Sequence, residues 1–184
     1  MGGARMNRKD IAPKAEPAPT PLVSSADLDV SDYPNVNIPD SRRDALTEHA
    51  RRISDNAVGS YDQHLTGLLG EDALARYLNI ADELDVEIYP DGGDGGVDLC
   101  YQGATIDVKT VGRHRTNPAL TVDAYRPLNA DYYVLVSRIG PCDFRLVGYT
   151  PRWFVANAPV WKNNEGGQYH MIGQDYLFPF SHYR

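Results

Sequence analysis

GGVDLCYQGATIDVKT, residues 95–110, is the stretch that decides the fold. The central pair Gln102-Gly103 predicts a two-residue hairpin turn, and the resulting register places Asp98 directly opposite Asp107. Because side chains alternate along a strand, Asp98, Asp107 and Lys109 share one face. Cys100 and Thr105 lie on this face too, and the other carries Val97, Leu99, Tyr101, Ala104, Ile106 and Val108. We expect the second face to enter the core and the first to carry the chemistry.

Two opposed carboxylates destabilise a hairpin unless something neutralises them, and a divalent cation does so. Mg²⁺ prefers oxygen ligands, commonly one or two carboxylates with waters and substrate phosphates. We therefore expect Asp98 and Asp107 to bind Mg²⁺, with the backbone carbonyl of Val108 completing the shell and Glu71 arriving from a helix. Such a metal lowers the pKa of a bound water and screens charge on a phosphodiester. Lys109 would orient or deprotonate that water, or stabilise the transition-state charge.

The helix that carries Glu71 is predicted at about 64–78, where leucines and alanines recur at helical spacing. Asp72 and Arg76 form an i,i+4 pair that we place along an exposed edge. On a helical wheel Glu71 falls outside that edge, so its carboxylate should point toward a packed partner. A salt bridge between Glu71 and an arginine is the structural alternative to a role in the site.

The rest of the chain predicts an α+β sheet domain. Ser41 is a candidate cap for a helix reaching about residue 57, and a short helix should start near Pro151. Strands are expected at about 85–89, 97–101, 104–110, 119–124, 132–137 and 144–149, with an extended segment from Tyr169 to Phe180.

The length of 184 residues fits one domain. Residues 1–38 are rich in Pro, Ala, Ser and Asp and predict a disordered or extended tail, so the domain should span 39–184. No apolar run reaches the length of a membrane span and no signal region follows the N-terminus, which predicts a soluble, cytoplasmic protein. Cys100 and Cys142 form no metal-binding or disulfide pattern.

The formal charge of −7 argues against simple wrapping of nucleic acid, but the charge is unevenly distributed. The chain is strongly acidic from Glu71 to Asp98, whereas the stretch after Asp107 is rich in arginine. Arg113, His114 and Arg115 directly follow the DVK strand and are candidates to contact a phosphate backbone. A solvated loop is the alternative interpretation of these three residues.

These residues together resemble the PD-(D/E)XK nuclease superfamily, which includes restriction endonucleases, Holliday junction resolvases, phage recombination exonucleases and repair nucleases. The resemblance spans about 64–150 and rests on Gly70-Glu71, Asp98 and Asp107-Val108-Lys109. It implies a restriction-endonuclease-like fold, in which a central mixed sheet is flanked by helices. It also implies Asp98 and Asp107 as metal ligands, Lys109 as the catalytic lysine and Glu71 as the helix carboxylate.

The chain departs from the family pattern at two points. Val97 stands where the family name has proline. The family also usually places a helix after the lysine-bearing strand, whereas residues 111–130 predict a loop and an extra strand.

The leading hypothesis is a Mg²⁺-dependent deoxyribonuclease, with Mn²⁺ substituting, that works as a homodimer or in a larger complex and has a phage or prophage origin. DNA against RNA and endonuclease against exonuclease action stay open. One alternative is a catalytically inactive module that binds nucleic acid or protein on the same fold. Another is a metal-free carboxylate-pair hydrolase such as a glycosidase. Trp153, Phe154 and Trp161 are candidates for base stacking, against the alternative of core residues.

Overall fold

The computed structural model describes residues 33–55, 59–81, 96–112 and 117–180. The elements are β1 (Asn35–Asn37), α1 (Asp40–Ser54), α2 (Tyr61–Tyr77), β2 (Leu99–Tyr101), β3 (Ala104–Val111), β4 (Ala119–Asp123), β5 (Tyr132–Arg138), β6 (Asp143–Pro151), α3 (Arg152–Asn157), β7 (Val160–Lys162), β8 (Gln168–Gly173) and η3 (Gln174–Tyr176). None of the described helices has the length and apolar character that crossing a membrane requires. The strand expected at 85–89 lies outside the described residues.

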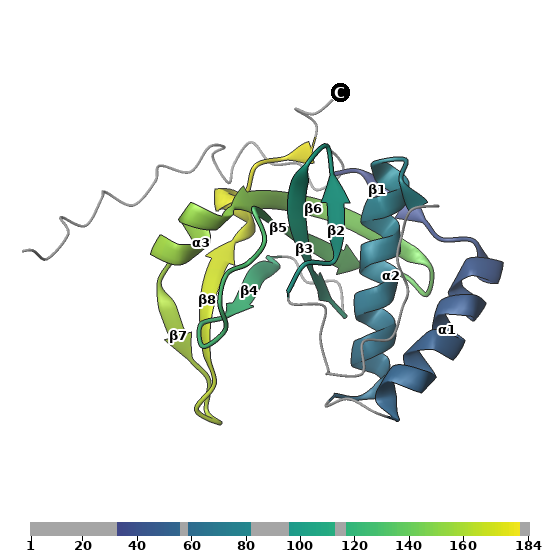
Figure 1. Ribbon diagram of the computed structural model, residues 1–184, viewed down its shortest axis with the longest axis horizontal. Coiled ribbons are helices and arrows are strands. Elements are labelled where there is room, and N and C mark those ends of the chain that lie inside the picture. Colours follow the sequence, from purple (N-terminus) through teal and green to yellow (C-terminus); the bar gives the residue numbers. More distant parts are fainter. Residues whose placement is uncertain (1–32, 56–58, 82–95, 113–116, 181–184) are drawn as a thin grey trace, which may run out of the picture.

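The strands form two sheets, which confirms the expected mixture of helices and a mixed sheet. The larger sheet has the order β1-β6-β5-β3-β2, and only β3 and β5 run parallel. The smaller sheet has the order β4-β8-β7. Figure 1 shows α1 and α2 on one side of the larger sheet and the smaller sheet with α3 on the other. The chain therefore crosses from β3 to the parallel strand β5 by way of β4, as the strand predicted at 119–124 indicated.

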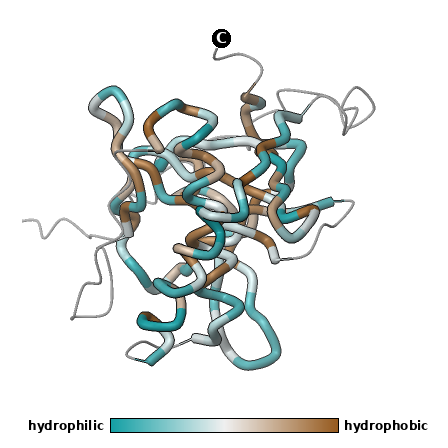
Figure 2. Tube along the Cα trace, turned by 90° about the vertical axis from the view of Figure 1, so that its right-hand side faces the viewer, coloured by the Kyte–Doolittle hydropathy of each residue, from teal (hydrophilic) through white to brown (hydrophobic). Residues whose placement is uncertain are grey.

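Two hydrophobic clusters hold the layers together, one on each face of the larger sheet. The first joins α1 and α2 to alternate residues of β3, β5 and β6, including Val108, Val134 and Leu146. The second joins the other face to the smaller sheet and α3, including Tyr133, Leu135 and Leu120. Figure 2 shows hydrophobic segments running through the middle of the molecule and hydrophilic ones in the outer loops. Because successive side chains of a strand point to opposite faces, the same sheet contributes residues to both hydrophobic clusters.

Both long helices start at residues other than those expected. A capping box starts α2: the Ser60 hydroxyl accepts from the Gln63 N–H at 3.3 Å, and the Ser60 N–H donates to Gln63 Oε1 at 2.8 Å. The predicted cap of α1 at Ser41 is wrong, because that helix starts at Asp40 after Pro39 and has no side-chain cap. Proline is suited to this place because it has no N–H to leave unpaired.

The fold reaches back before residue 39. β1 is an edge strand and pairs with β6, from Asn35 opposite Arg145 to Asn37 opposite Asp143, and Tyr33 and Ile38 on either side of β1 are buried. The expected tail of residues 1–38 therefore contains a strand of the main sheet. The composition of residues 1–38 gave no sign of this strand, because a short edge strand needs only a few apolar residues to pack beside an existing sheet.

Asp72 corrects the expected orientation of α2. Its ion pair with Arg76 exists, with 2.6 Å between Arg76 Nε and Asp72 Oδ2, but the Asp72 side chain is 0% exposed. Helix α1 covers the Asp72 side chain, and its Arg42 Nε lies 2.7 Å from Asp72 Oδ1. The buried carboxylate with two arginine partners is thus Asp72, and it joins the two helices.

Candidate active site

The β2–β3 hairpin has the predicted turn, and the predicted register holds from Leu99 to Tyr101. The expected pairing of Asp98 directly opposite Asp107 is wrong, because the Asp98 N–H donates to the carbonyl of Ile106, the residue opposite Leu99. Leu99 pairs with Ile106 and Tyr101 with Ala104, which leaves Gln102 and Gly103 as the two turn residues. Their φ angles of 51° and 83° are both positive, as a type I′ turn requires. The turn thereby sets the position of every side chain along β3.

The two faces of β3 separate as the alternation predicted. Ile106 and Val108 are buried in the cluster beneath α1 and α2. Asp107 and Lys109 alternate with them and so face the other side, where Tyr133 belongs to the second cluster. Val97 is the exception to the expected pattern, because it packs against this second cluster instead of the first.

Asp98 lies just before β2 and uses both its backbone and its carboxylate to bind β3. Its N–H donates to the Ile106 carbonyl at 2.8 Å, and its Oδ2 accepts from the Val108 N–H at 2.6 Å. The N–H and C=O of one strand residue point to the same edge, so the Val108 carbonyl is directed toward Asp98 as well. The expected neighbours Asp98 and Val108 are therefore brought together at the edge of β3.

Asp107 is buried and forms an ion pair with Lys109, whose side chain is 38% exposed. Removing a carboxylate from water is costly unless a partner compensates it, and the Lys109 ammonium is that partner. Lys109 therefore contacts both the buried Asp107 carboxylate and the solvent.

Tyr133 is a neighbour of Asp107 that the sequence did not reveal. It lies beside Asp107 in the parallel register of β3 and β5, and it is buried. Burial raises the pKa of the Tyr133 phenol, and the charge of Asp107 adds to this effect. The phenol thus stays protonated beside the carboxylate. The alternation of YYVLVS would have placed Tyr133 on one face of its strand, but not next to Asp107, because strand order is not visible in a single sequence.

Glu71 comes from the helix layer, on the face opposite Asp107 and Lys109. The preceding residue, Gly70, lies directly against Thr110: a Cβ atom added at Gly70 would be 1.8 Å from Thr110 Oγ1. α2 thus meets β3 one residue after Lys109, and Glu71 is half-buried there.

Gly70 sets how closely α2 approaches β3, and we expect Gly70→Ala to destabilise the fold. The added methyl must displace the Thr110 side chain, and overpacking of this kind costs about 1–3 kcal/mol. Gly67→Ala is the matched control in the same helix, since its nearest neighbour would be Glu71 Oε1 at 3.8 Å. There we expect no loss, or a gain of about 0.5–1 kcal/mol from helix propensity. Urea unfolding of both variants measures the difference, and equal effects would contradict the close contact.

The donors at the edge of β3 suit a hard cation. Two carboxylates, Asp98 and Asp107, together with the Val108 carbonyl offer oxygen ligands, and Mg²⁺ completes such a shell with water. Within the described ranges, no three His, Cys, Asp or Glu side chains form a metal-binding group. A cation at this edge would be bound by the carboxylates of Asp98 and Asp107, called the aspartate pair below, and by the Val108 carbonyl. Glu71 lies in the helix layer next to this strand. Arg113, His114 and Arg115, expected to contact phosphates, lie outside the described residues.

Comparisons with known proteins identify no relative. No family model, curated protein or solved structure matches this chain.

Proposed function

We propose that this protein is a Mg²⁺-dependent nuclease with a restriction-endonuclease-like fold, which hydrolyses phosphodiester bonds in DNA. The observation that carries the proposal is the bond from the Val108 N–H to the Asp98 carboxylate, beside the ion pair of Asp107 and Lys109. It brings Asp98 to the edge of β3 at Val108, and the neighbouring residues Asp107 and Lys109 add a second acid and a lysine.

Each residue has a role that follows from its position. Asp98, Asp107 and the Val108 carbonyl would hold Mg²⁺, or Mn²⁺ in its place. When bound, the cation lowers the pKa of a water and neutralises charge on the phosphodiester. Lys109 reaches the solvent from a buried partner, so its ammonium orients the attacking water or binds the charge that develops on the phosphate. Glu71 lies in α2 on the opposite face of the sheet, so its role as the helix carboxylate rests on the family resemblance alone.

The arrangement of the main sheet supports the restriction-endonuclease-like part of the proposal. A hairpin that carries Asp98 and Asp107 lies beneath a long helix, and the lysine-bearing strand runs parallel to β5. The crossover between these parallel strands passes through β4 in a second sheet, where the family has a helix. Asp107 and Lys109 still have a parallel neighbour, because β5 pairs along β3 from Ile106 to Val111.

The substrate and assembly belong to the same proposal. Arg113, His114 and Arg115 directly follow Gly112 in the sequence, so they are candidates to bind the phosphate backbone next to the cleaved bond. The proposal includes action as a homodimer or within a larger nuclease complex, of phage or prophage type.

Cleavage of a mixed substrate panel tests the proposal. Supercoiled plasmid, linear duplex, single-stranded DNA, a four-way junction and structured RNA are incubated with Mg²⁺, with Mn²⁺ and with EDTA. We expect cleavage of at least one DNA substrate that EDTA abolishes. Cleavage that survives EDTA would contradict the metal-dependent reaction. Binding of nucleic acid without cleavage under any condition would support the inactive binding module instead.

A further inference from the structure

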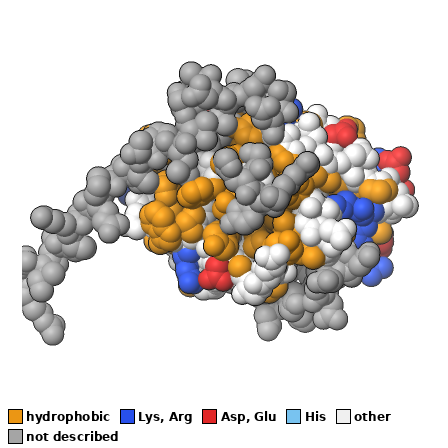
Figure 3. Space-filling model, turned by 90° about the horizontal axis from the view of Figure 1, so that it is seen from above, with side chains coloured by type: hydrophobic (Ala, Val, Ile, Leu, Met, Phe, Trp, Pro, Cys, Tyr) orange, Lys and Arg blue, Asp and Glu red, His pale blue; other side chains and the backbone are white. Residues whose placement is uncertain are grey.

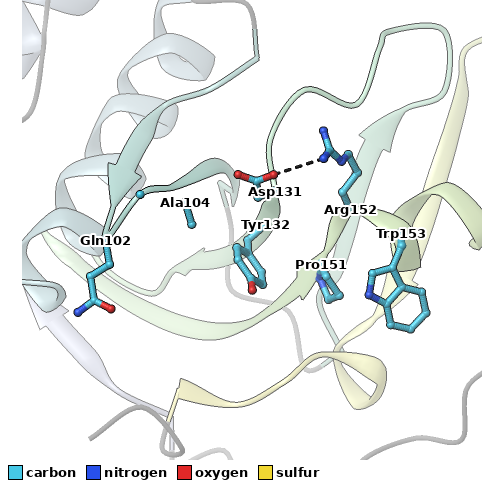
Figure 4. Close-up of a pocket in the computed structure, with 8 residues that line it drawn as sticks. Gln102, Ala104, Asp131, Tyr132, Pro151, Arg152 and Trp153 are labelled. Carbon is cyan, nitrogen blue, oxygen red and sulfur yellow. Dashed lines mark hydrogen bonds and ion pairs between the residues drawn. The ribbon is translucent and has the colours of Figure 1, made fainter.

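A second candidate site lies at the other end of β3. A pocket of about 550 Å³ is formed by the β2–β3 turn, the start of β5, the end of β6 and the first turn of α3. Its residues include Gln102, Ala104, Asp131, Tyr132, Pro151 and Trp153, which Figure 4 shows around a common open space. At about 3.3 Å per strand residue, Ala104 is roughly 17 Å from Lys109. The pocket is therefore separate from the aspartate pair but lies on the same strand.

One side of the pocket is aromatic and open to solvent. The Trp153 side chain is 55% exposed, and its indole packs edge-on against Phe154 with 5.6 Å between ring centroids. Tyr132 and Pro151 lie next to it, and Tyr132 is in turn supported by Tyr149 at 6.1 Å. Hydrophobic side chains also gather over the molecule on the side of the β2–β3 turn (Figure 3). The indole is thus held by its neighbours while much of it stays available for stacking.

The neighbouring side of the pocket, next to Trp153, is polar and charged (Figure 4). Asp131 Oδ2 accepts from the Thr105 N–H at 3.1 Å and from its hydroxyl at 2.9 Å, and Asp131 Oδ1 lies 3.3 Å from Arg152 Nη2. The hydrogen bonds from the Thr105 backbone and hydroxyl hold the pKa of the Asp131 carboxyl below its usual value. Asp131 is therefore a fixed ionised acceptor, and the half-exposed Arg152 is a cation beside it.

We propose that this pocket binds one unpaired base of single-stranded nucleic acid, stacked on Trp153, with the neighbouring phosphate near Arg152. A base fits this combination because it has a flat apolar face and a polar edge, and its strand carries negative charge. A purely apolar ligand would make no use of the half-exposed Arg152 guanidinium. The identity of the ligand as nucleic acid rests on the proposed nuclease function. A single nucleic-acid strand bound at both the pocket and the candidate active site would extend along β3 from the pocket to Asp107.

Binding of labelled oligodeoxythymidylate in EDTA tests the pocket separately from cleavage. By fluorescence anisotropy we expect Trp153→Ala to weaken binding about 5- to 150-fold, the range for loss of one base stack. Trp153→Phe should retain most of the affinity. Trp161→Ala is the matched control: Trp161 was a stacking candidate too and is equally exposed, at 57%, but it lies on β7 and does not line the pocket, so we withdraw it as a candidate. Thermal unfolding of each variant verifies that it is folded.

Three results would overturn this assignment: no loss with Trp153→Ala, an equal loss with Trp161→Ala, or thymidine monophosphate binding as tightly as the oligonucleotide. The last would assign the pocket to a free nucleotide. The two proposals fail separately. Trp153-dependent binding without cleavage in Mg²⁺ would contradict only the nuclease, whereas cleavage with binding indifferent to Trp153 would contradict only the pocket.

Discussion

Asp107→Asn is expected to lower metal-dependent cleavage by about 10³-fold, the scale seen when a single group that stabilises the reacting charge is removed. The substitution keeps the shape of the side chain but removes the charge that binds Mg²⁺ and pairs with Lys109. Single-turnover cleavage of the substrate identified by the panel measures the rate. Asp123→Asn is the control, because this aspartate lies on β4, where it accepts from the Tyr125 N–H at 2.8 Å and lies 3.7 Å from Arg126, and the variant should cleave normally.

Lys109→Met separates metal binding from catalysis. Loss of the ammonium should abolish cleavage while Mn²⁺ binding, followed by electron paramagnetic resonance, is retained or strengthened, because the Asp107 oxygen is released from its ion pair. Asp107→Asn should weaken both properties. Full cleavage by either variant, or Mn²⁺ binding indifferent to Asp107→Asn, would rule out the roles that we assign to these two residues.

Asp72→Asn is expected to destabilise the protein by about 3–5 kcal/mol, because breaking a buried ion pair leaves its partners uncompensated. The Asp72 side chain is 0% exposed, and its two oxygens bind Arg42 of α1 and Arg76 of α2 at 2.7 and 2.6 Å. The amide cannot balance two guanidinium groups. Urea unfolding followed by far-ultraviolet circular dichroism measures the loss.

Glu48→Gln is the matched control for Asp72→Asn. Glu48 also contacts two arginines, Arg51 at 3.4 Å and Arg52 at 3.5 Å, but it lies on the exposed face of α1. Exposed pairs contribute about 0–1 kcal/mol, so little change is expected. If the two variants lose similar stability, burial of Asp72 does not increase the contribution of its ion pairs to the free energy of unfolding.

Local patterns predicted the hairpin at the centre of the candidate site. The pair Gln102-Gly103 has the positive φ angles that a two-residue turn needs, and the turn alone determines the pairing of Leu99 with Ile106. Alternation then predicts that Asp107 and Lys109 share a face. These features depend on residues close in sequence, which is why the sequence of the hairpin predicts them.

Features that depend on distant partners were missed or misplaced. β1 forms only because β6 offers it an edge, and β7 because β8 does. Asp72 is buried because α1 covers that side of α2, which the helical wheel of α2 does not contain. In each case the deciding residue lies in another element.

The sequence by itself determined the turn, the alternation of β3 and the set of acids and lysine along it, since these follow from backbone geometry over a few residues. Only the tertiary structure decided that Tyr133 lies beside Asp107, that α2 contacts β3 at Gly70, and that Trp153 borders a pocket. The physical reason is that strand order, helix placement and pocket shape arise from burying apolar surface between elements that are distant in the chain.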